Sequence, residues 1–205
     1  MDLAWRAVAA VARVAIWLGG AMLFAAAAIV TAEVLLRKGL GALFGSNFVF
    51  SGSDEISAYL FAVGTSWSMA HVLVTRGHVR IDALYGAFGP RTRTFLDLFA
   101  LIVLGIFVGA LLERAWDIAF TSYVENIRSN TPLRLPLAWS QLPWFGGIAL
   151  FALALALAIL RTLLALVRGD YAAAASISGA ITQDEEIKSE LEGLGIGKDK
   201  AGAGT

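Results

Sequence analysis

Four long stretches of the chain are almost entirely apolar. They run from about Val14 to Leu36, from Asp54 to Thr75, from about Phe95 to Leu112, and from about Phe145 to Leu160, the last continuing to Val167. A helix needs about 20 predominantly apolar residues to cross the hydrocarbon core of a bilayer. The pattern therefore predicts an all-α membrane protein with four transmembrane helices.

The first of these stretches is longer than the apolar region of a signal peptide. We therefore expect it to be a membrane helix. Near its end Glu33 and Arg37 are four residues apart, a spacing at which opposite charges meet on a helix surface. We expect these two side chains to form an ion pair at the membrane surface.

The second stretch has the clearest ends. Ser53 can cap its first turn, and Asp54 and Glu55 place negative charge at the positive end of the helix dipole. About 19 residues without formal charge follow them, close to the length that a membrane requires. At the other end Arg76 lies near the last carbonyl groups, and Gly77 is the expected stop residue.

The connection after this stretch, residues 76–94, carries apolar side chains at helical spacing: Ile81, Leu84, Tyr85 and Phe88. This spacing predicts a short amphipathic helix on the membrane surface, between the second and third transmembrane helices. The pair Gly89-Pro90 ends it. The turn that leads into this helix contains Arg76, Gly77, His78, Arg80 and Asp82. We expect it to lie on the cytoplasmic side of the membrane.

Residues 123–144 contain three of the four prolines and two tryptophans. Proline interrupts helices and tryptophan favours the lipid–water boundary, so we expect an extended, interfacial hairpin connection here. The glycine-rich residues 39–52 are expected to form an interfacial loop. Together these features divide the chain into a cytoplasmic N-terminus (1–13), a four-helix transmembrane domain (14–168) and a polar, largely disordered cytoplasmic tail (169–205).

Small residues indicate where the helices can approach one another closely. In the third stretch Gly105 and Gly109 form a G-x-x-x-G pattern, and in the second stretch Gly64 and Ser68 have the same spacing. Such positions let the backbones of two membrane helices come together. We predict that these four residues are helix-packing positions.

The composition agrees with a membrane protein and excludes several functions. The chain is 58% hydrophobic and only 16% charged, whereas soluble domains have about 25% charged residues. Its formal net charge is zero, so no overall field attracts nucleic acid. Because the chain has no cysteine, disulfides, thiolate metal sites and thiol redox chemistry are excluded.

Lysine and arginine near the apolar stretches indicate the orientation. Eight of them fall on the side that holds both termini and residues 76–94, against four or five on the other side. Cytoplasmic segments carry the excess of these residues, so both termini are expected in the cytoplasm. Asp54 and Glu55 then lie on the outer side of the membrane.

No pattern for enzymatic chemistry is present. The two histidines, His71 and His78, lie at one end of one helix and could not hold a haem from two sides. Asp97 and Asp117 are about 30 Å apart along one helix and could not form a catalytic pair. Charged residues also avoid the middle of the membrane, where the ion or substrate path of a complete carrier would need them. We therefore expect no cofactor and no metal, and an accessory or scaffold subunit as the function.

Two motifs resemble a known family. The stretch S-x-D-E-x-x-x-Y-L-F followed by R-G-x-V-R-I-D, and the later N-T-P-L-R-L-P-L-A-W-x-Q-L-P-W, are similar to the small membrane subunit of tripartite ATP-independent periplasmic (TRAP) transporters, the DctQ-type or Q subunit. The resemblance covers about Ala15 to Leu160.

The resemblance implies a function and partners. It implies a scaffold in the bacterial inner membrane that braces a large multi-spanning subunit, in an importer of organic acids driven by a sodium gradient. It also implies that a periplasmic solute-binding protein delivers the substrate. On the expected topology Asp54 and Glu55 lie on the outer surface, where this protein must dock, so we expect them to take part in docking or in a salt bridge to another subunit. The alternatives are that they only cap the helix, or that one of them pairs with Arg37 or Arg128 of this chain. An assembly or scaffold subunit of another membrane complex is the alternative. Besides these proteins, membrane lipid is the expected partner, and no nucleic acid is expected.

Overall fold

The computed structural model describes residues 2–40, 52–77 and 89–179. Within them lie four long helices, α1 (Asp2–Leu35), α3 (Ser53–Val74), α5 (Pro90–Val124) and α6 (Ala138–Val167), and the shorter α7 (Tyr171–Ser178). A π-helical turn, η1 (Leu36–Leu40), continues α1. The four long helices are each long and apolar enough to cross a membrane, which confirms the predicted fold class. The expected amphipathic helix around residues 81–88 and most of the loop 39–52 lie outside the described residues.

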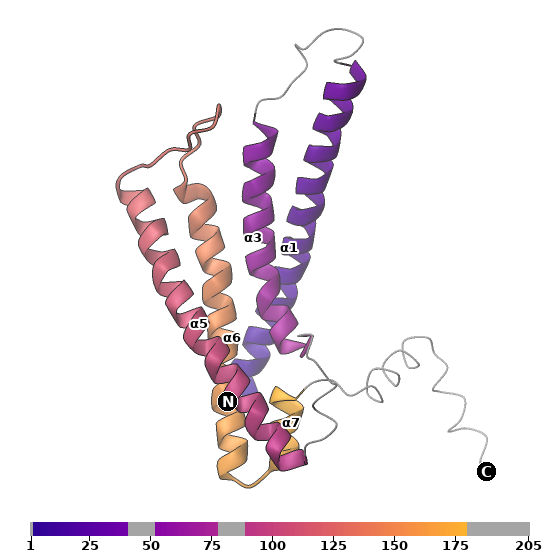
Figure 1. Ribbon diagram of the computed structural model, residues 1–205, viewed down its shortest axis with the longest axis vertical. Helices are drawn as coiled ribbons and strands as arrows, with labels where there is room; N and C mark the ends of the chain where they lie inside the picture. The colour runs from indigo at the N-terminus through magenta and orange to yellow at the C-terminus, as the bar shows by residue number, and fades with distance from the viewer. Residues whose placement is uncertain (1, 41–51, 78–88, 180–205) are drawn as a thin grey trace, which may run out of the picture.

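The helices form two antiparallel pairs, α1 with α3 and α5 with α6, and α3 also packs against α6. Figure 1 shows the pairs meeting at the end of the bundle where α7 lies and diverging towards the other end. We call the first the α7 end. The second, formed by the end of α1, the start of α3 and the connection 125–137, is the hairpin end.

Three of the helices extend beyond the predicted apolar stretches. Helix α1 begins at Asp2 and α5 runs from Pro90 to Val124, so each has 34 or 35 residues. At 1.5 Å per residue they are about 50 Å long, well over the roughly 30 Å of a hydrocarbon core. Their ends must therefore project from the membrane or tilt within it.

Helices α1 and α3 touch through small residues. A methyl group added to Gly19 would lie 2.5 Å from both the carbonyl oxygen of Gly64 and the hydroxyl oxygen of Ser68. A methyl group on Gly64 would in turn lie 2.8 Å from the carbonyl oxygen of Gly19. Real side chains do not fit at such distances, so this contact depends on having no Cβ atom at either glycine.

Helices α3 and α6 touch in a similar way. A methyl group added to Gly147 would lie 2.7 Å from the backbone carbon of Ser66 and 2.7 Å from Cδ1 of Trp67. Beside this contact, the indole nitrogen Nε1 of Trp67 donates a hydrogen bond of 2.8 Å to the carbonyl oxygen of Pro143. The two helices are therefore joined by close backbone packing and by one interhelical hydrogen bond.

The sequence predicted an extended connection as far as Trp144, and this prediction is wrong for its last residues. Helix α6 begins at Ala138 and contains Pro143. The missing amide of this proline leaves only the carbonyl of Trp139 without its helical partner. Trp139 lies in the first turn and is 73% exposed, so the unpaired carbonyl falls at the accessible end of the helix, where the loss is small.

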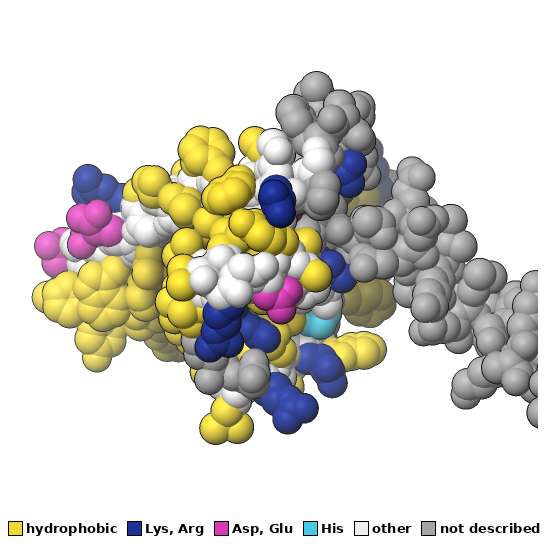
Figure 2. All heavy atoms as spheres, turned by 90° about the horizontal axis from the view of Figure 1, so that it is seen from below, with side chains coloured by type: hydrophobic (Ala, Val, Ile, Leu, Met, Phe, Trp, Pro, Cys, Tyr) yellow, Lys and Arg dark blue, Asp and Glu magenta, His cyan; other side chains and the backbone are white. Residues whose placement is uncertain are grey.

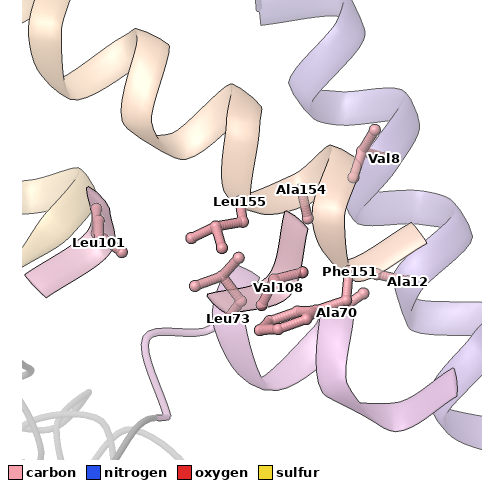
Figure 3. Close-up of a cluster of buried hydrophobic side chains, with 9 residues drawn as sticks. All are labelled: Val8, Ala12, Ala70, Leu73, Leu101, Val108, Phe151, Ala154 and Leu155. Atoms are coloured by element: carbon pink, nitrogen blue, oxygen red, sulfur yellow. The ribbon is translucent and has the colours of Figure 1, made fainter. Parts of the chain in front are cut away.

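All four long helices contribute to one buried apolar cluster, shown in Figure 3. It comprises Val8 and Ala12 of α1, Ala70 and Leu73 of α3, Leu101 and Val108 of α5, and Phe151, Ala154 and Leu155 of α6. Phe151 is the largest of them and is 2% exposed. Three of the nine are alanines, so the helices meet here at short distances around one aromatic ring.

Gly147 and its neighbour Gly146 provide a matched test of this packing. Gly147→Ala should lower the free energy of unfolding by about 1–3 kcal/mol, because its methyl group has no space beside Ser66 and Trp67. Gly146→Ala meets no atom within 4 Å and should stabilise the helix by up to about 1 kcal/mol. The unfolding midpoint of each variant in detergent measures the difference. Equal midpoints for the two variants would contradict the packing described here.

Candidate functional site

The side chain of Glu55 is buried at the hairpin end, with 4% of its surface exposed. The hydroxyl of Tyr59, one turn further along α3, donates a hydrogen bond of 2.7 Å to Oε1 of Glu55. The hydroxyl of Thr131 donates one to Oε2. Because Thr131 belongs to the connection between α5 and α6, Glu55 joins the start of α3 to the second pair of helices.

The connection 125–137 is itself an ordered hairpin. Arg128 and Pro136 form an isolated antiparallel bridge, and the amide of Ser129 donates to the carbonyl of Leu135 at 3.0 Å. A second such bond of 3.0 Å runs from the amide of Leu137 to the carbonyl of Ile127. These bonds hold Thr131 at a defined position above the start of α3.

Ser53, the first residue of α3, makes a second polar contact. Its hydroxyl donates a hydrogen bond to the carboxylate of Glu33 on α1, and the side chain is 2% exposed. We expected Glu33 to pair with Arg37 on its own helix; in the structure its partner is instead the first residue of the next one. The residue at the N-cap position of α3 is Gly52, which has no side chain, and Ser53 is the first residue of the helix itself. Ser53 and Glu55 thus connect α3 to α1 and to the hairpin respectively.

The two acids that the sequence singled out have different surroundings. Glu55 is enclosed beneath the hairpin, whereas Asp54 is exposed. Four cationic residues at the hairpin end are exposed as well: Arg37, Lys38, Arg128 and Arg134. Asp54 is therefore the acid of this pair that a second protein could reach without displacing the hairpin.

The four predicted packing positions also divide into two groups. Gly64 and Ser68 lie in the contact between α1 and α3. A methyl group on Gly105 would lie 3.2 Å from the side chain of Ile159 on α6, whereas one on Gly109 would meet no atom within 4 Å. Both glycines line a hollow of about 420 Å³ between α5 and α6, whose other lining residues are all apolar. The α5–α6 hollow is thus open on the surface of this chain.

The turn that follows α3 departs from the expectation for Gly77. The amide of Arg76 bonds to the carbonyl of Leu73 at 3.1 Å, and that of Gly77 bonds to the carbonyl of Val72 at 2.8 Å. These bonds form a Schellman motif in which the left-handed residue is Arg76, with φ +57°, and not the glycine. An arginine in this conformation costs more than a glycine would. The remaining residues of the predicted turn, His78, Arg80 and Asp82, lie outside the described residues.

Two further helices end in the same way. Asn126 after α5 and Gly169 after α6 have φ of +47° and +75°. Asparagine and glycine are the residues that most readily adopt this conformation, so the sequence carried a signal for both turns. In the part of the chain that the structure describes, no group of three or more histidine, aspartate or glutamate side chains could hold a metal ion.

A comparison with protein families found one matching family model, "Tripartite ATP-independent periplasmic transporters, DctQ component", over residues 26–165. The matched region begins within α1 and ends in the last turns of α6. It includes Glu55, the hairpin and the α5–α6 hollow, whereas α7 lies outside it. No curated protein and no solved structure matches the chain.

The hydrogen bond between Glu55 and Thr131 can be tested by a double-mutant cycle. Thr131→Val and Glu55→Gln should each lower the unfolding midpoint and speed hydrogen exchange at the amides of Ser129 and Leu137. The double variant should be little worse than the more damaging single one, because both remove the same interaction. Asp54→Asn, the control, should leave exchange in the hairpin unchanged. Fully additive effects of Glu55→Gln and Thr131→Val would show that the two side chains do not interact.

Proposed function

The chain belongs to the DctQ family of tripartite ATP-independent periplasmic transporters, and we propose that it is the small scaffold subunit of such a transporter. In this role it braces a large multi-spanning subunit that carries organic acids inwards with a sodium gradient. A periplasmic binding protein supplies the substrate. The observation that carries the proposal is the family match, which spans about two thirds of the chain, including most of its membrane region.

The charge distribution supports a scaffold over a carrier. The residues between Glu55 and Arg76 in α3, and those between Arg134 and Arg161 around α6, include no lysine, arginine, aspartate or glutamate. A path for an organic anion and a cation needs charged or polar groups in the middle of the membrane. Two serine side chains in this region form hydrogen bonds within their own helix instead. Ser66 and Ser68 donate to carbonyl groups of their own helix, those of Val63 and Gly64.

The α5–α6 hollow supports contact with another membrane helix. A methyl group added to Gly109 would meet no atom within 4 Å, and the neighbouring Ile106 and Phe107 are 70% and 64% exposed. Membrane helices associate through close packing at small residues, because lipid tails solvate apolar side chains equally well. We assign this face to a helix of the large subunit.

We also propose that the hairpin end faces the periplasm and meets the binding protein. The lysine and arginine count favours a cytoplasmic location for both termini, and hence for the α7 end. Asp54 then lies exposed on the outer side, at the same end of the bundle as the exposed arginines of the hairpin. Docking of a binding protein is transient, so complementary charges should act mainly on its rate of association. Glu55 contributes by holding the hairpin in place.

The contact with the large subunit can be tested at Gly109. Gly109→Leu should fill the hollow and reduce the amount of large subunit that copurifies with a tagged chain. Gly20→Leu is the matched control, because Gly20 is also a helical glycine with no atom within 4 Å of an added methyl group. Transport should fall in parallel with assembly. If both variants retain the large subunit equally well, this face is not the contact.

The docking role of Asp54 can be tested separately. Asp54→Asn should raise the concentration of binding protein needed for half-maximal uptake and weaken the dependence of uptake on salt, with the membrane complex intact. Unchanged uptake at every binding-protein concentration would exclude a docking role for Asp54.

The orientation can be checked by labelling in intact cells. A cysteine at position 130 should react with a membrane-impermeant reagent, whereas a cysteine at position 91 should not. Labelling at position 91 would contradict this orientation.

A further inference from the structure

Helix α7 folds back against the ends of the membrane helices, in a region that the sequence pattern assigned to a polar tail. The chain turns at Gly169, where the amide of Asp170 donates to the carbonyl of Ala165 at 3.0 Å. The carboxylate of Asp170 then caps α7 by accepting a hydrogen bond of 2.9 Å from the amide of Ala173. Ala174 is fully buried, and Figure 1 shows α7 beside the lower ends of α5 and α6.

A cleft of about 380 Å³ lies between α7 and the last turns of α6. Its wall on α6 includes Arg161 and Arg168, which are seven residues apart and therefore on the same face, about 10 Å from each other along the axis. Its other lining residues are Asp170 and four apolar residues, among them Leu164 and Ile177. The cleft thus combines two cations with an apolar wall.

The charges in the cleft favour an anion. Arg161 is held with its guanidinium carbon 4.9 Å from the centre of the Trp5 ring on α1, so its position is partly fixed before any ligand arrives. Asp170 is the one acid among the lining residues, and its carboxylate already accepts the capping hydrogen bond of α7. The described lining of the cleft thus includes two arginines and one carboxylate, and the carboxylate is engaged in the cap.

The cleft lies at the depth of the lipid headgroups. Arg161 is the first charged residue that α6 reaches after its long apolar stretch. On other faces of the same turns Leu163 and Val167 are 39% and 85% exposed, as expected of side chains that meet lipid. Figure 2, which views the molecule from the α7 end, shows lysine and arginine side chains distributed around hydrophobic surface. This pattern is typical of the boundary between the hydrocarbon core and the headgroups.

We propose that this cleft binds the phosphate group of an anionic membrane phospholipid. Planar guanidinium groups suit phosphate oxygens, with which they form paired hydrogen bonds. The apolar wall suits the glycerol and the first acyl carbons, which a free phosphate ion lacks. Such a lipid would join α6, α7 and, through Trp5, the start of α1. None of the lining residues belongs to the α5–α6 hollow or to the hairpin end, so this inference stands apart from the proposed function.

Native mass spectrometry of the full-length chain, delipidated in detergent and then given phosphatidylglycerol, tests the proposal. The wild-type chain should retain one phosphatidylglycerol in preference to phosphatidylcholine. Arg168→Gln should weaken retention about fivefold, and Arg161→Gln with Arg168→Gln by several times more, since each basic side chain near anionic lipid contributes about 1 kcal/mol. Arg6→Gln removes an exposed arginine at the same end outside the cleft and should change retention little.

Three results would overturn the proposal. The first is equal retention by the double variant and Arg6→Gln. The second is equal retention of phosphatidylglycerol and phosphatidylcholine by the wild-type chain. The third is displacement of the lipid by inorganic phosphate at similar concentration, which would show that the cleft recognises the free ion. Unfolding midpoints of the variants, measured without added lipid, show whether the double variant is folded. If the double variant is unfolded, the single variant Arg168→Gln tests the proposal instead, because the side chain of Arg168 is exposed.

Discussion

Helices inside a bilayer gain little from the hydrophobic effect when they associate, because lipid tails surround apolar side chains as well as protein does. The contact between Gly19 and Gly64, and that between Gly147 and Ser66, show how this chain meets the constraint. At each, the absence of a Cβ atom lets two backbones approach, so that many weak packing contacts form along the helices. Helix α3 takes part in both contacts and so lies between α1 and α6.

At the hairpin end, where the helix pairs diverge, buried polar contacts join the elements. Glu55 and Ser53 are buried there and bind Thr131 of the hairpin and Glu33 of α1. A buried carboxylate is tolerated only when hydrogen bonds satisfy it, so this arrangement permits few alternative positions of the hairpin. A subunit that braces a moving partner needs such a fixed geometry. Under the proposed scaffold function, the open α5–α6 hollow and the exposed Asp54 would lie on a support of fixed shape.

The sequence predicted the four helices because about 20 uncharged apolar residues have few alternatives in a membrane. It predicted the ends of α3 closely but not those of the other three helices: segments such as Asp2–Arg13 carry no strong helix stop, and Pro143 lies where a helix can tolerate it. Asp54 and Glu55 were identified because they lie in the first turn of a membrane helix. Their different environments depend on Thr131, which is 76 residues away from Glu55 in the sequence. Contacts over such separations leave no periodic signal in the chain.

The claim that the chain is a fixed support can be measured directly in the assembled transporter. Spin labels at Val34 of α1 and Val124 of α5, both exposed at the hairpin end, report the distance between the two helix pairs. Pulsed electron paramagnetic resonance should give the same distance distribution without sodium, with sodium, and with sodium and substrate together. A shift of the main distance by several ångströms between these conditions would contradict the account, because the helix pairs would then move with the transport cycle.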